Sequence, residues 1–222
     1  LGNQLRAVYD RICSTLPESV SVEPGQMDRL FDVEDIHATP VHPEIWKTLE
    51  TAIRQGRKLR TNYYVAAKNK TTARTIDPYC LKLFRGDWYL LGKDSLTGRI
   101  PVFAVRRIRS VQALEETFVK DTGFDPKAYF ANVFGIENSP EEYTVKITFS
   151  SYAAGYIREK TWHPRQKAVP RKDGGLTLSF PSRSLDEIKR WVLAWGAEAK
   201  ALAPKKLQQM IREDCANILK LY

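Results

Sequence analysis

Apolar residues recur at helical spacing in one short stretch of the chain and alternate with polar residues in the stretch that follows it. The first stretch begins near Pro43 and stops at Gly56, residues suited to the start and the end of a helix. Its apolar face comprises Ile45, Trp46, Leu49, Ala52 and Ile53. About five short strand-like runs then follow between residues 57 and 119, separated by turns such as the one at 85–87. One helix followed by closely spaced short strands predicts a small β-barrel.

The second half of the chain predicts a different order of elements. Ser184 and Glu187 fit a capping box at the start of a strongly amphipathic helix, and Gly196 ends it. Strands are predicted at 143–149, 166–171, 176–180 and 197–203, and helices at 151–160, at 184–195 and from 204 onward, with Leu207, Met210, Ile211 and Ile218 of the last helix facing inward. The order βαββαβ followed by a helix indicates a split βαβ sandwich with one extra helix. The predicted fold class is therefore α+β.

These elements divide the chain into three predicted parts. Residues 1–42 form a connector that begins with a helix, residues 43–134 form the barrel domain with a short helix at 124–134, and residues 135–222 form the second domain. The opening helix is expected from the helical spacing of Leu1, Leu5, Val8 and Ile12. Because this pattern starts at the first residue, which is not Met, we expect the chain to be part of a longer protein.

Positive charge is concentrated in the barrel domain. The formal net charge is +9, and it divides into −4 for residues 1–43, +8 for residues 44–119 and +5 for residues 120–222. Seven basic and no acidic residues lie between Glu50 and Asp77, with tyrosines interleaved. Arginine binds phosphate and aromatic rings stack on bases, so this stretch favours a nucleotide or a single-stranded nucleic acid as ligand. A solubilising surface, with about half of the aromatic residues in the barrel core, is the alternative.

Several classes of protein find little support in the sequence. The apolar runs are shorter than the ~18 residues that cross a membrane, and no signal peptide is visible. The cysteines Cys13, Cys80 and Cys215 are odd in number and widely spaced, which argues against disulfides and zinc sites and favours a reducing cytoplasm. Neither a phosphate-binding glycine loop nor a nucleophile–base pair is present. We therefore predict no catalytic residue, no metal, no cofactor and no enzymatic activity.

Four segments in the barrel stretch resemble one known family. Trp88-Tyr89-Leu90, within Gly86–Gly92, resembles the signature of the WYL domain. The helix at 43–55 leads into a basic strand ending at Tyr63, Arg74–Tyr79 resembles the family's Arg-x-x-x-Pro segment, and Phe103–Ile108 resembles its Phe-Arg-Leu-Asp-Arg-Ile segment. This match covers roughly residues 43–119. Farther on, the segment from Trp191 to Gly196, then Ala203-Pro204 and a closing helix, resembles the C-terminal extension called WCX.

The resemblance implies an Sm-like barrel that senses a ligand, often a nucleotide or nucleic acid, followed by a ferredoxin-like WCX domain. It implies a ligand site formed by Tyr63, Arg74, Tyr79, Tyr89, Lys93, Arg106 and Arg107. Two positions depart from the family pattern, since Ala104 stands where the family has Arg and Arg106 where it has Asp. If the strand continued past Val105, Arg106 would point to the opposite face from Val105. The departures suggest a ligand that differs from the family's usual one.

Two functions of different classes follow. The chain is expected to be the sensing region of a bacterial transcriptional regulator, whose N-terminal winged helix-turn-helix domain binds double-stranded DNA and lies outside this sequence. The alternative is an accessory single-strand-binding module of a nuclease, helicase or defence system. A homodimer is expected for the regulator, because paired DNA half-sites require two DNA-binding domains held at a fixed spacing. The free face of the second domain's sheet, the last helix and the stripe at Leu1–Ile12 are the candidate contacts.

Overall fold

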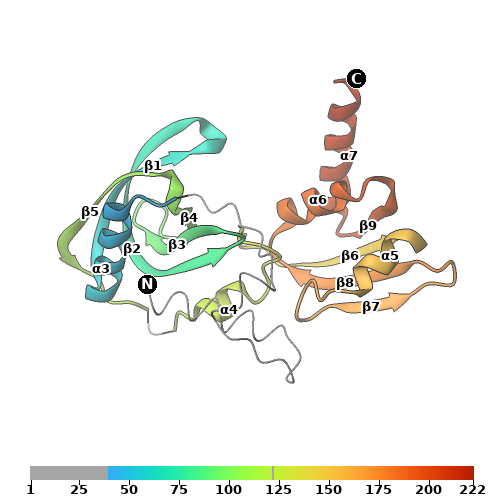
Figure 1. Cartoon of the computed structure of the whole chain (residues 1–222), viewed down its shortest axis with the longest axis horizontal. Coiled ribbons are helices and arrows are strands. Elements are labelled where there is room, and N and C mark those ends of the chain that lie inside the picture. The colour runs from blue at the N-terminus through green and yellow to red at the C-terminus, as the bar shows by residue number, and fades with distance from the viewer. Residues whose placement is uncertain (1–39, 122) are drawn as a thin grey trace, which may run out of the picture. The chain divides into compact units, whose positions relative to one another are not determined.

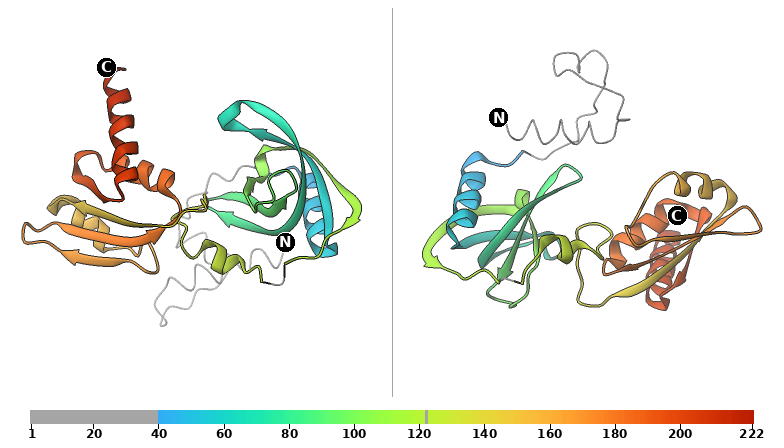
Figure 2. Two further views of the ribbon diagram at one scale, coloured as in Figure 1. Left: turned by 180° about the vertical axis from the view of Figure 1, so that it is seen from behind. Right: turned by 90° about the horizontal axis from the view of Figure 1, so that it is seen from below.

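The computed structural model describes residues 40–121 and 123–222 of the protein (Figures 1 and 2). These residues form a mixed α+β structure with two antiparallel sheets, as the sequence predicts. The apolar stripe of Leu1, Leu5, Val8 and Ile12, and most of the predicted connector, lie outside the described residues. Within the described residues, no helix is long and apolar enough to span a bilayer.

The first sheet contains the strands for which the sequence predicts a small barrel. Its elements are α3 (Pro43–Gln55), β1 (Arg57–Val65), η2 (Ala66–Lys68), β2 (Lys70–Phe84), β3 (Asp87–Asp94), β4 (Val102–Ala104), η3 (Val105–Arg107) and β5 (Ile108–Thr117). The strand order is β4-β3-β2-β1-β5, and every neighbouring pair is antiparallel. The predicted helix and five strands are confirmed. The fourth strand is shorter than predicted, because the chain turns into a 3₁₀ helix after Ala104.

Helix α3 covers the core of this sheet. It starts at Pro43 and ends at Gly56, whose φ of 62° is left-handed and costs glycine little. Leu49 and Ala52 are fully buried among strand residues that include Leu59, Ile76 and Leu90. Trp46 and Trp88 meet edge to face, with ring centroids 4.8 Å apart. The predicted amphipathic face of α3 therefore packs on the inward-facing residues of the strands.

The second sheet follows a short linker. The linker contains α4 (Pro126–Phe130), and the sheet region contains β6 (Tyr143–Phe149), α5 (Ser151–Arg158), β7 (Lys167–Pro170), β8 (Leu176–Ser182), α6 (Leu185–Ala194), η4 (Gly196–Glu198), β9 (Ala199–Ala203) and α7 (Lys205–Leu219) (Figure 1). The strand order β7-β8-β6-β9 is antiparallel throughout. The predicted sequence of strands and helices is confirmed.

One face of the second sheet forms the core beneath its helices. Val145, Ile147 and Phe149 alternate inward along β6, as predicted, and pack with Ile188 and Val192 of α6. The last helix departs from the prediction: Leu207 is buried, whereas Ile218 is 46% exposed. Figure 1 shows why, since α7 projects beyond the rest of its domain and its last turns have no sheet beneath them. The prediction of an inward Ile218 was wrong.

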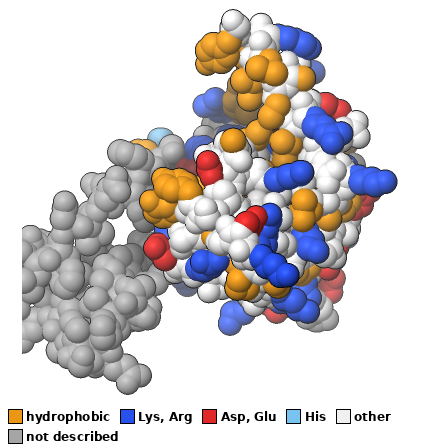
Figure 3. Space-filling model, turned by 90° about the vertical axis from the view of Figure 1, so that its right-hand side faces the viewer, with side chains coloured by type: hydrophobic (Ala, Val, Ile, Leu, Met, Phe, Trp, Pro, Cys, Tyr) orange, Lys and Arg blue, Asp and Glu red, His pale blue; other side chains and the backbone are white. Residues whose placement is uncertain are grey.

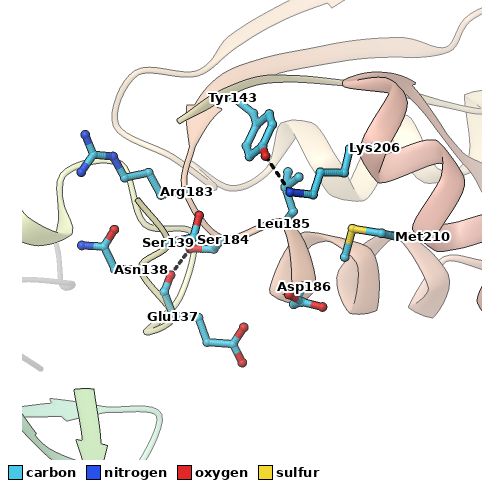
Figure 4. A pocket seen from close by; sticks show the side chains of 10 residues that line it. All are labelled: Glu137, Asn138, Ser139, Tyr143, Arg183, Ser184, Leu185, Asp186, Lys206 and Met210. Atoms are coloured by element: carbon cyan, nitrogen blue, oxygen red, sulfur yellow. Dashed lines mark hydrogen bonds between the residues drawn. The ribbon is translucent and has the colours of Figure 1, made fainter. Parts of the chain in front are cut away.

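The predicted capping box at the start of α6 is not formed. Ser184 Oγ instead donates to the carbonyl of Glu137 at 2.5 Å and accepts from the Phe134 amide at 3.2 Å (Figure 4). The Glu187 carboxylate accepts from the backbone amides of Ile136 and Glu137 at 2.9 and 3.2 Å. The bent linker at 134–137 has backbone groups that need hydrogen-bond partners, and both side chains bond to it. We call this set of contacts the Glu187 clamp.

The clamp depends on a glycine in the linker. A Cβ on Gly135 would lie 2.1 Å from Oε1 of Glu187, closer than any real contact. The predicted domain boundary at Gly135 is thus a point where the backbone is held tightly against α6. The short helix α4 also covers fewer residues than the 124–134 predicted, and the Asp125 side chain caps it by accepting from two amides.

Candidate ligand-binding site

Two adjacent hollows lie between the β4 region and the linker. They share five lining residues, Tyr63, Pro101, Val102, Tyr129 and Asn138. The larger, of about 720 Å³, also contains Arg74 and is called the Arg74 hollow. The smaller, of about 360 Å³, also contains Tyr89, Arg106 and Arg107 and is called the Arg107 hollow. Together they make a groove lined by arginine and tyrosine.

Tyr63 forms the shared floor of the groove. Strand alternation turns it inward from β1, where its ring meets Phe103 edge to face at 5.1 Å. Its hydroxyl accepts a hydrogen bond from the Ala104 amide at 3.1 Å. The side chain is 8% exposed. Tyr63 therefore fixes the position of β4 and offers the groove mainly the edge of its ring.

Arg74 is held by a buried carboxylate. Its Nη1 lies 2.8 Å from Oδ2 of Asp94, which is 2% exposed, and its Nε donates to Thr72 Oγ1 at 3.1 Å. Asp94 also accepts from the amide of Leu96 and the hydroxyl of Thr97, which fixes the turn after β3. Arg74 thus lines the groove with part of its hydrogen-bonding capacity already used. Arg74 therefore helps to fix the turn after β3 and also lines the groove, where the sequence predicts that it contacts a ligand.

Arg106 and Arg107 both line the Arg107 hollow. The sequence argument expected Arg106 to point away if the strand continued, but β4 ends at Ala104 and the 3₁₀ turn places both arginines at the hollow. Arg106 forms an ion pair with Asp87, and this hydrogen bond raises the pKa of Arg106. Arg107, by contrast, makes no salt bridge within residues 40–121 and 123–222. Its guanidinium is available to a ligand.

Tyr89 lies beside these two arginines. Burial raises the pKa of its hydroxyl, the charge of Asp87 adds to the rise, and Arg106 and Arg107 oppose it. The hydroxyl is therefore protonated at neutral pH and can donate a hydrogen bond. A half-buried donor next to an unpaired guanidinium suits an anionic ligand oxygen.

Tyr79 and Lys93 do not line either hollow. Tyr79 is 5% exposed, stacks on Phe118 and meets Phe124 at a tilted angle. Burial, with the charges of Asp77 and Asp121, raises its pKa. Lys93 is exposed on β3, opposite Asp77 in the register of the sheet. The structure brings together five of the seven predicted site residues, and these two lie elsewhere.

Several lining residues were not predicted. Tyr129 of α4 donates its hydroxyl to the Ile100 carbonyl at 2.5 Å, and the Asn138 side-chain nitrogen donates to the Tyr129 carbonyl at 3.2 Å. The Asn138 side-chain oxygen is buried and has no hydrogen-bond partner within the described part of the chain. Arg99 and Arg183 add positive charge to the Arg74 hollow. Spacing alone could not find these residues, because they come from a turn, a linker and the second domain.

The acidic residues at the groove are already paired. Asp94 forms an ion pair with Arg74, and Oε1 of Glu137 lies 2.9 Å from Nη2 of Arg190. Arg183 is paired with Glu142, whereas Arg99, like Arg107, forms no salt bridge within the described residues. The unpaired charge at the groove is therefore positive. Among the described residues, no group of three or more His, Cys, Asp or Glu side chains is placed to hold a metal ion.

The chain is a mixed α+β protein with two antiparallel sheets and a groove whose unpaired charge is positive. Comparison with protein families identifies both domains: the WYL domain model matches residues 44–113, and the WCX domain model matches residues 141–219. The chain belongs to the family of WYL-domain proteins that carry a WCX domain. The resemblance seen in the sequence is confirmed.

Curated relatives share both regions at low identity. Protein PafC of Mycobacterium tuberculosis is 25% identical over 174 residues, which cover 78% of this chain and 54% of PafC. Protein PafB of Mycobacterium bovis is 26% identical over 164 residues, which cover 72% of this chain and 48% of PafB. The chain therefore spans about half the length of these relatives.

A solved structure with a related fold is described as a CRISPR Cas-related protein. It superposes with a TM-score of 0.53 and 10% sequence identity, over 81% of this chain and 51% of the other. At this identity the likeness concerns the fold alone. It extends across both sheets, since four-fifths of the chain is covered.

Proposed function

We propose that this chain is the ligand-sensing region of a bacterial transcriptional regulator and that its groove binds a nucleotide or a single-stranded nucleic acid. The observation that carries the proposal is the unpaired guanidinium of Arg107 beside Tyr89. A phosphate oxygen can accept hydrogen bonds from both a guanidinium and a tyrosine hydroxyl.

The finer description of the two folds belongs to the same proposal. An Sm-like barrel is supported by the leading helix, the strand order β4-β3-β2-β1-β5 and the 3₁₀ turn before β5. A ferredoxin-like domain is supported by the order β7-β8-β6-β9, in which each βαβ unit is split by a strand of the other. Both small folds leave sheet surfaces open to ligands.

We further propose that the groove binds its ligand without transforming it. Both carboxylates that line it, Asp94 and Glu137, are committed to ion pairs and are poorly placed to act as a general base. An oligonucleotide incubated with the pure protein should run unchanged on a denaturing gel. Cleavage that is lost when either carboxylate is replaced would contradict this.

Arg107→Ala should weaken binding of a labelled nucleotide or short oligonucleotide by about tenfold to a hundredfold. Loss of one charge-assisted hydrogen bond costs roughly 1.5–3 kcal/mol. Fluorescence anisotropy or calorimetry measures the change. Arg54→Ala is the matched control, because Arg54 is exposed on α3 and engaged only with Glu50. Equal affinities of wild type and Arg107→Ala for all nucleotides and oligonucleotides tried would overturn the proposed site.

The regulator would bind double-stranded DNA through a winged helix-turn-helix domain outside these 222 residues and act in the cytoplasm. This part rests on the family resemblance and on relatives about twice as long. A homodimer is proposed, with the end of α7 as a contact. Figure 3 shows apolar side chains along α7, and Ile218, Leu219 and Leu221 are 46%, 77% and 80% exposed.

Replacing Ile218 and Leu219 by Ser should shift the protein from dimer to monomer at micromolar concentration. The substitution removes apolar area from the proposed contact without disturbing a core, because both side chains are largely exposed. Light scattering measures the mass. Val169→Ser, which alters an exposed apolar residue of β7, is the control. A wild-type chain that is monomeric under the same conditions would remove this helix from the proposal.

A further inference from the structure

The outward face of β1 lies on the other side of the strand from the groove. Alternation sends Leu59, Thr61 and Tyr63 inward, so Arg60, Asn62 and Tyr64 point outward. The register sets Asn62 between Ala73 of β2 and Ser110 of β5, and its side chain donates to Ser110 Oγ at 3.0 Å. The centre of this face is therefore made of short, uncharged side chains.

A β-bulge adds an arginine to this face. Asn62 pairs with Ser110 but Tyr63 pairs with Ile108, which leaves Arg109 as the extra residue of β5. The guanidinium carbon of Arg109 lies 5.2 Å from the centroid of the Tyr64 ring. The Tyr64 hydroxyl donates to Asn69 Oδ1 at 2.9 Å, which fixes the ring at the base of the β1–β2 turn. Tyr64 and Arg109 thus form an oriented aromatic–arginine pair on the surface.

Positive charge continues from this pair in both directions. Lys68 lies in the β1–β2 turn, which extends beyond the other strands of the sheet (Figure 1), and Arg60 lies at the opposite end of the face. Arg60, Lys68 and Arg109 are all exposed. Within residues 40–121 and 123–222, none of these three forms a salt bridge, although Arg54, Arg57, Arg74 and Arg106 do. We call these three residues and Tyr64 the outer face.

We propose that the outer face is a second nucleic-acid-binding surface, which holds the backbone of a single strand and stacks one base on Tyr64. Three unpaired cations complement a polyphosphate backbone, and the half-buried ring of Tyr64, which contacts Arg109, offers a base a flat partner. A duplex would offer no free base to Tyr64, so an unpaired strand is the better fit. The inference rests on the proposed function only for the class of ligand, since the surface shares no residue with the groove.

The test compares two variants with the same net charge. Arg60→Gln/Lys68→Gln/Arg109→Gln removes three charges from the outer face, and Lys160→Gln/Lys172→Gln/Lys220→Gln removes three exposed charges from the second domain. Anisotropy with labelled 12-mers of dT and of rU measures affinity over a series of salt concentrations. We expect the first variant to bind at least tenfold more weakly. The slope of log affinity against log salt concentration should become shallower by about 2, since each single-strand phosphate contact contributes about 0.7. The control should stay within about twofold.

The stacking step has its own pair of variants. Tyr64→Leu should lose about tenfold in oligonucleotide affinity, whereas Tyr64→Phe keeps the ring and should bind as wild type does. Equal losses in the two triple variants, or a duplex of the same sequence binding as tightly as the single strand, would overturn the proposal. Preference between dT and rU tells whether DNA or RNA is the natural strand.

The same experiment separates this inference from the proposed groove. The outer-face variants should leave binding of a mononucleotide unchanged, whereas Arg107→Ala should weaken it. If Arg107→Ala has no effect and the outer-face variants do, the groove proposal fails and the outer face stands. The reverse outcome removes the outer face and leaves the groove.

Discussion

Asp94→Ala is expected to lower the free energy of unfolding of the WYL domain by about 3 kcal/mol. Removing one partner of a buried ion pair leaves the other charge uncompensated, at a cost of roughly 3–5 kcal/mol. We take the lower end because the Arg74 side chain is 18% exposed. The substitution also frees the amide of Leu96 and the hydroxyl of Thr97. Urea denaturation followed by tryptophan fluorescence measures the loss.

Glu50→Ala is the matched control for Asp94→Ala. Glu50 pairs with Arg54 on the exposed surface of α3, where side chains are 45% and 77% exposed. Exposed pairs of this kind contribute about 0.5 kcal/mol. Equal stability losses in the two variants would mean that Asp94 is not the tether of the turn after β3. Arg74 would then be free to serve the ligand alone.

Gly92→Ala is expected to destabilise the WYL domain by about 3 kcal/mol. A Cβ at this position would meet Cγ2 of Ile76 at 2.5 Å, the carbonyl oxygen of Asp77 at 2.7 Å and Cα of Pro78 at 3.2 Å. Two of these three contacts are with backbone, which cannot move aside as a flexible side chain can. Overpacking of this kind costs roughly 1–3 kcal/mol or more. The glycine that ends the WYL segment is thus required by the close approach of β2.

Gly155→Ala is the control for Gly92→Ala, with an effect of opposite sign. Gly155 lies in α5, and a Cβ there meets nothing within 4 Å. Alanine is favoured over glycine inside a helix by about 0.5–1 kcal/mol, so this variant should be more stable than wild type. Thermal or urea unfolding of the two variants side by side tests the pair. A Gly92→Ala protein as stable as wild type would show that β2 and β3 can separate without cost.

The sequence predicted the elements of the fold well because their signals are local. Pro43 and Gly56 bound α3, and the alternation along β6 matches its buried face from Val145 to Phe149. The prediction failed where a distant segment competes for a side chain. Ser184 and Glu187 fit a capping box by spacing, yet their oxygens bond a linker about 50 residues away. The spacing of residues along the chain does not indicate such a distant hydrogen-bond partner.

The candidate site was predicted less completely than the fold. Tyr63, Arg74 and Arg107 were found because the family pattern marks them, and they do line the groove. Tyr79 was expected there and is instead part of an aromatic cluster with Phe118 and Phe124. Asn138 could not have been predicted, because only the tertiary structure brings the linker to the first sheet.

The Glu187 clamp would couple the free energy of ligand binding at the Arg107 hollow to the free energy of packing the linker on α6. Ile136 and Glu137 line the Arg107 hollow, and their amides are the ones that Glu187 holds. A ligand that binds this linker better in one position than in another must shift the clamp's equilibrium by the same factor, and a change at α6 must alter ligand affinity reciprocally. Two hydrogen bonds to one carboxylate set the scale of that coupling at a few kcal/mol. For a ligand bound at the Arg107 hollow, the linker would be the segment that couples binding to α6, and the strength of the Glu187 hydrogen bonds would limit that coupling.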